Sequence, residues 1–244
     1  MSFTDTRFVI IGASGGVGSA LSRRLKTHGA QPILLGRSAA RLALLGEELG
    51  AQTQALDASR ADELDQAISA LGPIHGIVNC AGSILLKPAH LTTEAEWKQV
   101  IETNLTTAYA TVRAGARALE STGGSIVLCA TAAARTGFAN HEAIAAAKGG
   151  VIGLTLSAAA TYAPRNIRVN CVAPGLLDTP LTARITSNPA ALKASTAMHA
   201  LGRIGRAEDV ASAIAWLLDP ENHWVTGQIL GVDGGLGTVR SRLP

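Results

Sequence analysis

The chain has 244 residues, a formal net charge of +3 and a hydrophobic content of 47%, whereas charged residues make up 16% and aromatic residues only 3%. This composition excludes a disordered, highly charged chain and predicts an interior rich in small aliphatic side chains. A doubly wound or barrel α/β fold of this length commonly forms around one core. We therefore predict a single domain, residues 1–244.

Three other bulk features narrow the class of protein. Basic residues are spread along the chain, which does not favour a nucleic-acid partner. Cys80, Cys129 and Cys171 show no Cys-x-x-Cys spacing and lie within or at the ends of apolar runs, so we predict free thiols and no metal site. The N-terminus lacks the features of a signal peptide, and no apolar segment reaches the roughly 18 residues of a membrane span. We therefore expect a cytoplasmic protein without a membrane partner.

Short apolar runs alternate with longer helical patterns along the chain. Helical patterns are clearest at residues 17–28, 93–119 and 207–218. Several of the apolar runs are nearly continuous in Val, Ile and Leu, which is typical of parallel strands that helices cover on both faces. The repetition of strand, helix and strand predicts a doubly wound α/β sheet. The seven predicted strands are RFVIIGA, QPILLGR, AQTQALDA, IHGIVNCAG, GSIVLCAT, IRVNCVAPG and GQILGVDGG.

One long connection, residues 176–205, shows no clear pattern of secondary structure. A loop of that length without structure in a compact domain is usually functional. Its apolar side chains, such as Leu181, Ile185 and Met198, favour an apolar ligand. We therefore expect this connection to form a lid over a substrate.

A glycine cluster, GASGGVG, follows the first predicted strand and precedes a helix. Gly12, Gly16 and Gly18 let the backbone turn tightly and approach a pyrophosphate, whose charge the helix N-terminus favours. The second strand ends at Gly36 and Arg37, near the position where an NAD site usually has an acidic residue. Arg37 suits a 2′-phosphate, so the pattern predicts NADP(H) rather than NAD(H). The alternative is a solvated arginine at a strand end.

Further motifs follow in order along nearly the whole chain. They are LDAS with Asp57, VNCAG at 78–82, ETNL with Asn104, Lys148, IRVNCVAPG with Pro174 and Gly175, Thr179, and VDGG at 232–235. Together with the glycine cluster, these motifs resemble the short-chain dehydrogenase/reductase superfamily. The resemblance implies a Rossmann-type fold whose seven parallel strands follow the order 3-2-1-4-5-6-7, with helices on both faces.

The resemblance also implies which residues hold the cofactor. Arg37 contacts the 2′-phosphate in this scheme, and Lys148 holds the hydroxyl groups of the nicotinamide ribose. The other implied cofactor-binding residues are Gly12, Ser14, Gly16, Val17 and Gly18 at the pyrophosphate turn, Asp57 and Ala58 by the adenine, Asn79, Ala81 and Gly82 by the ribose, and Pro174, Gly175 and Thr179 after the sixth strand.

The catalytic tyrosine of the family is missing. It usually lies four residues before the lysine, where this chain has Ile144, and an isoleucine side chain has no proton to donate. The family's serine corresponds to Thr131, and its asparagine corresponds to Asn104. Loss of a general acid of this kind costs roughly 10²–10⁴ in rate.

His141 is a candidate replacement for the tyrosine. It lies seven residues before Lys148, so on a helix it falls within about 20° of Lys148 and faces the same cleft. Enoyl-thioester reductases of the divergent branch are similar, because their tyrosine lies seven residues before the lysine. With Asn140 as the N-cap, a neutral His141 imidazole would donate a hydrogen bond to an enolate oxygen. A surface histidine at a helix start is the alternative interpretation.

The sequence therefore predicts an NADP(H)-dependent oxidoreductase that acts on a small-molecule carbonyl or conjugated carbonyl. Its predicted catalytic residues are Asn104, Thr131, His141 and Lys148. The alternative is a catalytically silent NADP(H)-binding protein, a sensor or a structural subunit, because the nucleotide-holding features persist without the tyrosine. Retention of Asn104 favours the enzyme.

Residues 140–163 form a predicted helix that is apolar or small on nearly every face. Such a helix must be covered all round. One side meets the sheet, and we expect the other side to meet a second copy of the chain, in the homodimer or homotetramer that the resemblance implies. The polar final segment, GTVRSRLP, is interpreted either as a tail or as a contact with a neighbouring subunit.

Overall fold

A computed structural model describes residues 2–239 and shows a seven-stranded parallel sheet in the order β3-β2-β1-β4-β5-β6-β9. The seven strands coincide with the seven predicted runs, so the predicted fold is confirmed, with the seventh run as β9. A separate pair of short strands, β7 and β8, was not predicted. Residues 240–244 of the final segment lie outside the described range, and its interpretation stays a prediction. The strands are β1 Arg7–Ile11, β2 Gln31–Gly36, β3 Gln52–Ala55, β4 Gly76–Asn79, β5 Gly124–Cys129, β6 Ile167–Pro174, β7 Leu177–Asp178, β8 Gly205–Arg206 and β9 Ile229–Val232.

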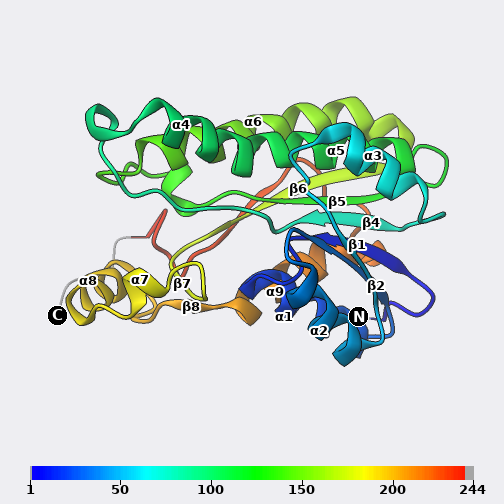
Figure 1. Cartoon of the computed structure of the whole chain (residues 1–244), viewed down its shortest axis with the longest axis horizontal. Helices are drawn as coiled ribbons and strands as arrows, with labels where there is room; N and C mark the ends of the chain where they lie inside the picture. The colour runs from blue at the N-terminus through cyan, green and yellow to red at the C-terminus, as the bar shows by residue number, and fades with distance from the viewer. Residues whose placement is uncertain (1, 240–244) are drawn as a thin grey trace.

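Helices cover both faces of the sheet because the central strands are apolar on both sides. Helices α3, α4, α5 and α6 lie on one face, and α1, α2 and α9 lie on the other (Figure 1). Two buried clusters of aliphatic side chains fill the space between the sheet and these two helix layers. These helices are α1 Gly16–Thr27, α2 Ala39–Leu49, α3 Ala61–Ser69, α4 Glu94–Ile101, α5 Thr107–Ala118, α6 Glu142–Tyr162 and α9 Ala207–Leu218, and the short 3₁₀ helices are Ala89–Leu91, Ala132–Ala134, Ala163–Arg165 and Pro220–Asn222.

The predicted helix at 93–119 is interrupted by a π-helical turn. Helix α4 begins after the N-cap Thr93, whose side chain and that of Glu96 form a capping box. A π turn, Glu102–Thr106, then separates α4 from α5. Single π turns inside α-helices occur frequently at functional sites, and Asn104 lies in this one.

The connection at 176–205 has more structure than the sequence indicates. It contains β7, two helices, α7 Ala183–Thr186 and α8 Pro189–Met198, and it ends at β8, which pairs with β7. Buried His199 fastens the end of α8 to the end of β6, because its Nε2 accepts a hydrogen bond from Leu176 N at 3.2 Å and its Nδ1 bonds Ser195 O at 2.7 Å. The expectation of a structureless loop was wrong. Helices α7 and α8 are only 4 and 10 residues long and bury no side chain fully, so their sequences show no clear hydrophobic periodicity.

Helix α6 also corrects the expectation that no apolar segment has membrane-spanning length. The stretch Glu142–Arg165 is long and apolar enough to cross a bilayer by length and composition, with a hydropathy of 1.5. It packs against β6, α4 and α5, and Val151 and Thr155 are fully buried. The core helix of a globular fold passes the same test, so this length alone is weak support for a membrane span.

Candidate active site

The turn after β1 and the first turn of α1 each require a glycine, Gly12 and Gly18. Gly12 has φ +77°, and a Cβ there would lie 2.7 Å from Ala81 N. A Cβ at Gly18 would collide with the carbonyl oxygen of Gly12. Helix α1 begins after Gly15, which provides no side-chain cap, so backbone N–H groups of the first turn stay available to an anion. This turn has the geometry of a pyrophosphate cradle.

A cleft of about 730 Å³ opens beside this turn, at the carboxyl ends of the strands. It brings together most of the predicted cofactor residues and three of the four predicted catalytic residues. Gly18 and Asn79 lie behind the lining: Asn79 Oδ1 accepts a hydrogen bond from Ala81 N at 2.9 Å, and its Nδ2 donates to Thr111 Oγ1 at 3.0 Å. The predicted residues that line the cleft are Gly12, Ser14, Gly16, Val17, Arg37, Asp57, Ala58, Ala81, Gly82, Asn104, Thr131, Lys148, Pro174, Gly175 and Thr179.

Two arginines lie at the end of the cleft next to β2. Arg37 follows the strand directly, and Arg41, in the first turn of α2, donates a hydrogen bond to Ser14 O. Asp57 Oδ1 accepts hydrogen bonds from Ser59 N at 3.0 Å and from Ser59 Oγ at 2.9 Å. These bonds, with the charge of Arg37, hold the pKa of Asp57 below its usual value. Arg41 was not among the predicted cofactor residues, although it lies in the same short basic segment, GRSAAR, as Arg37.

Lys148 extends from α6 to the carboxyl ends of the central strands. It is only 7% exposed, and its Nζ donates a hydrogen bond to Cys129 O at 2.7 Å. Burial lowers the pKa of this ammonium group. A Cβ at Gly82 would lie 3.5 Å from Lys148 Nζ and 3.1 Å from Asn104 Oδ1. A glycine at 82 therefore lets these two side chains approach the same point.

Asn104 is 1% exposed and makes three hydrogen bonds. Its Oδ1 accepts from Ser83 N at 3.1 Å, and its Nδ2 donates to Val100 O and to Ser83 Oγ, both at 2.9 Å. A backbone N–H only donates and a carbonyl oxygen only accepts, so these contacts fix the orientation of the amide. Asn104 thus fastens the loop after β4 to the π turn.

Thr131 and Ile144 occupy the positions of the family's serine and tyrosine. Both line the cleft. Thr131 Oγ1 accepts a hydrogen bond from Ala133 N at 3.3 Å, which leaves its hydroxyl proton for another acceptor. Ile144 is 5% exposed and packs with Val100 and Ala147. The predicted hydroxyl of Thr131 is therefore at the cleft, and the side chain in the tyrosine position is apolar.

The structure does not bring His141 into the cleft. His141 is itself the N-cap of α6, whereas the predicted N-cap, Asn140, has φ +63° and precedes the helix. The His141 ring lies 5.7 Å from the ring of Phe138, and its Nδ1 bonds Ala139 O at 2.7 Å. The expectation that His141 faces the same cleft as Lys148 was wrong, because a residue at the N-cap lies outside the helical phase and its side chain turns toward the preceding loop.

The residues present fit a nicotinamide dinucleotide. The two arginines, the glycine cradle and the buried lysine line one cleft and suit, respectively, an adenosine ribose 2′-phosphate, a pyrophosphate and a nicotinamide ribose. Such a cofactor would supply a hydride at its nicotinamide ring. Among residues 2–239, no three His, Cys, Asp or Glu side chains come together as ligands for a metal ion.

Comparison with known proteins places the chain in a family. A family profile described as "Enoyl-(Acyl carrier protein) reductase" matches residues 12–237. The cis-4-hydroxycyclohexanecarboxylate dehydrogenase of Sinomonas cyclohexanicum is 36% identical, over 98% of this chain and 99% of its own length. The galactitol 2-dehydrogenase (L-tagatose-forming) of Cereibacter sphaeroides is 35% identical, over 93% and 92%.

A solved structure agrees with these matches. The short-chain type dehydrogenase/reductase from Mycobacterium ulcerans superposes with a TM-score of 0.94 at 29% identity, covering 98% of this chain and 92% of that one. These relatives, which match nearly the whole chain, are named dehydrogenases or reductases. The strand order, the glycine cradle and the lysine of α6 agree with that assignment. The protein belongs to the short-chain dehydrogenase/reductase family and is an oxidoreductase of that family.

Proposed function

We propose that this protein is an NADP(H)-dependent oxidoreductase that interconverts an alcohol and a carbonyl on a small molecule without a catalytic tyrosine. The observation that carries the cofactor choice is the pair Arg37 and Arg41 beside β2. No acidic residue lies in the Gly36–Arg41 segment that lines this end of the cleft. A 2′-phosphate at this end would meet two guanidinium groups, whose charge-assisted bonds are strong.

The chain's own residues position the reacting groups. Lys148 holds the ribose hydroxyls next to the nicotinamide ring and raises the positive potential at the floor of the cleft. Thr131 has a hydroxyl proton free for the substrate oxygen, where negative charge grows as hydride arrives at carbon. Asn104 holds the loop after β4 in place.

The segment 176–205 supplies the cover for the substrate in this proposal. Pro180, Leu181 and Thr182 line the cleft, and Leu181 is 54% exposed. Exposed apolar side chains beside a cleft favour a ligand with an apolar body. Both a simple ketone and a conjugated carbonyl fit this description, and the relatives' names make the hydroxyl–ketone pair the first to test.

The test is NADPH oxidation with a panel of ketones and enones that includes 4-oxocyclohexanecarboxylate and L-tagatose, the carbonyl partners of the relatives' alcohols. We expect turnover of at least one carbonyl by the wild type, and little change in His141→Ala because that side chain lies outside the cleft. Turnover gained only in Ile144→Tyr would identify a silent NADP(H)-binding protein instead. Enone turnover lost in His141→Ala would restore the histidine as the donor.

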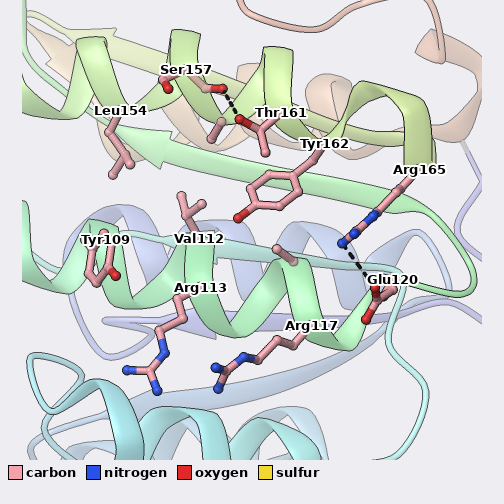
Figure 2. Close-up of a pocket in the computed structure, with 12 residues that line it drawn as sticks. Tyr109, Val112, Arg113, Arg117, Glu120, Leu154, Ser157, Thr161, Tyr162 and Arg165 are labelled. Carbon is pink, nitrogen blue, oxygen red and sulfur yellow. Dashed lines mark hydrogen bonds and ion pairs between the residues drawn. The ribbon is translucent and has the colours of Figure 1, made fainter.

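We further propose that the outer faces of α5 and α6 bind a second copy of the chain. Figure 2 shows the groove between these helices, of about 400 Å³, with Tyr109 and Tyr162 on its walls. Tyr109 and Leu156 are more than half exposed. A Cβ at Gly149 or Gly153 would meet nothing within 4 Å, so the chain's own packing does not require glycine there. Close approach of a helix from a second copy of the chain would require small residues at these two positions.

Leu156→Glu tests this interface, because it places a charge on an exposed apolar position of α6. Sedimentation equilibrium should show a dimer or tetramer for the wild type and a shift to monomer for the variant. A wild type that is monomeric at micromolar concentration contradicts the proposal.

For the location of the protein we propose the cytoplasm, since Cys80, Cys129 and Cys171 are all free thiols.

A further inference from the structure

Ser83 is a cleft residue that was not among the predicted site residues. It follows Gly82 in the loop after β4, is half-buried, and lines the same cleft as Thr131, Ile144 and Lys148. Its neighbours in the loop are apolar: Leu85 packs against the cluster that contains Ile144. The serine hydroxyl thus belongs to the same cleft as the side chain in the tyrosine position, and it lies 2.9 Å from Asn104 Nδ2.

Asn104 determines whether the Ser83 hydroxyl acts as a donor or as an acceptor in the hydrogen bond between them. One Nδ2 proton of Asn104 goes to Val100 O, and the other goes to Ser83 Oγ at 2.9 Å. Asn104 Oδ1 accepts from the Ser83 backbone N–H at 3.1 Å. The hydroxyl of Ser83 is therefore an acceptor toward Asn104, and its own proton is left to donate elsewhere.

Thr131 shows the same arrangement on the neighbouring strand end. Its Oγ1 accepts a hydrogen bond from Ala133 N, so its proton is also free. Gly82, the residue before Ser83, lies against both Asn104 Oδ1 and Lys148 Nζ. Two hydroxyl groups with oriented lone pairs and free protons thus line the cleft near the buried lysine, and a carbonyl oxygen can accept two such bonds.

We propose that Ser83 donates the hydrogen bond to the substrate's carbonyl oxygen that the missing tyrosine donates in the rest of the family, and that Asn104 is its positioning residue. This inference rests on the proposed carbonyl reduction. As hydride bonds to the carbonyl carbon, the π electron pair moves onto oxygen, where the hydroxyls of Ser83 and Thr131 stabilise it. The oxygen then takes the proton of Ser83 Oγ, which recovers one from water in the open cleft.

The experiment compares Ser83→Ala with Ser83→Thr, which keeps the hydroxyl, and with Ser121→Ala, a matched control on an exposed turn. We expect Ser83→Ala to lower kcat about 10²–10³-fold, the loss found when one oxyanion donor is removed. The KM and the NADPH affinity should change less than about threefold. Ser83→Thr should keep most of the activity, and Ser121→Ala all of it.

A spectroscopic readout separates this inference from the proposed function. 4-Oxocyclohexanecarboxylate bound with NADP⁺ cannot be reduced, and the infrared C=O band of the bound ketone reports hydrogen bonds to its oxygen. The band should be shifted to lower frequency in the wild type, and this shift should be smaller in Ser83→Ala. If the wild type shows the shift but no turnover, the proposed function fails while the role of Ser83 stands. An unchanged band in Ser83→Ala overturns that role.

A double variant, compared with Ile144→Tyr alone, tests for a purely structural role of Ser83. If Ser83 only fastens the loop to Asn104, Ser83→Ala will lower kcat in the Ile144→Tyr background as much as it does in the wild type. If Ser83 supplies the hydroxyl, the new tyrosine hydroxyl will restore at least part of the lost kcat, because the donor is then present again. A loss of NADPH binding in Ser83→Ala, with no rescue by Ile144→Tyr, also overturns the proposal.

Discussion

The two ends of the cleft are built in different ways. At the nucleotide end, backbone geometry makes the site: Gly12 with its positive φ, the start of α1, and the carbonyl and N–H groups around them. At the reaction end, side chains from distant elements make the site, namely Lys148 from α6, Asn104 from a π turn and Ser83 from a loop. Loss of one side chain, the tyrosine, is therefore compatible with an intact nucleotide end.

The reaction end should show the largest effect of a single substitution. Lys148→Met removes the only ammonium group among the residues that line the cleft, and we expect a fall in kcat/KM of at least roughly 10²–10³, the loss found when one electrostatic contact to the reacting oxygen is removed. The wild type and the variant should have the same circular dichroism spectrum. An activity within about tenfold of the wild type contradicts the role of Lys148.

The same variant makes a pH prediction. Burial lowers the pKa of Lys148 in the folded chain below 10.5, so the unfolded chain binds this proton more tightly. The contribution of Lys148 to stability is therefore unfavourable below the lowered pKa and is relieved as pH rises toward 10.5. As pH rises toward 10.5, the melting temperature of the wild type should increase relative to that of Lys148→Met. A constant difference between the two contradicts the lowered pKa.

The nucleotide end should depend on backbone space. Gly12→Ala combines a positive φ with a Cβ 2.7 Å from Ala81 N, and we expect a loss of roughly 2–4 kcal/mol of stability together with loss of NADPH binding. Gly50→Ala is the matched control, because Gly50 also has a positive φ, +55°, but nothing within 4 Å of its Cβ. It should cost about 1 kcal/mol and leave binding intact. Chemical denaturation gives the unfolding free energy of each variant. Equal losses in Gly12→Ala and Gly50→Ala would show that the close approach of Ala81 to Gly12 does not matter.

Arg37→Ala sharpens the cofactor choice at the nucleotide end. Loss of charge-assisted bonds to the 2′-phosphate should weaken NADPH binding about 10–100-fold. NADH binding should hardly change, because that cofactor lacks the phosphate. Fluorescence titration with both cofactors gives the two affinities. A parallel loss for NADH and NADPH assigns Arg37 to the adenine rather than to the phosphate.

The smallest effect is expected in the loop of the reaction end. Lys87 forms an ion pair with Glu96 at 2.8 Å, and this contact, with the N-cap Thr93, lowers the pKa of Glu96 to about 2. The stabilisation is present above the ordinary pKa of 4.5 and is lost as pH falls toward 2. Glu96→Gln should therefore melt slightly lower than the wild type at pH 7, and the difference should shrink on acidification. A difference that grows at low pH contradicts this.

The sequence predicted the nucleotide end well because the information there is local. The glycines of one turn and the apolar strands depend on neighbouring residues, and the strand order is as predicted; Gly12, Gly16 and Arg37 line one cleft, and their contacts with a cofactor stay a prediction. The reaction end was harder to predict. The hydrogen bonds between Ser83 and Asn104 join residues 21 apart, and no periodicity marks the π turn that makes them possible.

His141 illustrates the same limit. Helical phase predicted that it shares a face with Lys148, but the helix begins one residue later, at Glu142. An error of one residue at a helix end moves a side chain out of the site, and helix ends are the least certain feature of a sequence pattern. Arg41, in contrast, belongs to the same short segment as Arg37, so local sequence alone could have marked it as a second basic residue of the cleft.

The most direct test of the account is a single-turnover reaction with NADPH carrying deuterium at C4 of the nicotinamide and 4-oxocyclohexanecarboxylate as the acceptor. Mass spectrometry of the product alcohol reads the outcome. The account predicts that the wild type, with Ile144 in place, transfers deuterium to the carbonyl carbon. NADPH that stays bound and unreacted in the wild type, together with transfer in Ile144→Tyr, would contradict it.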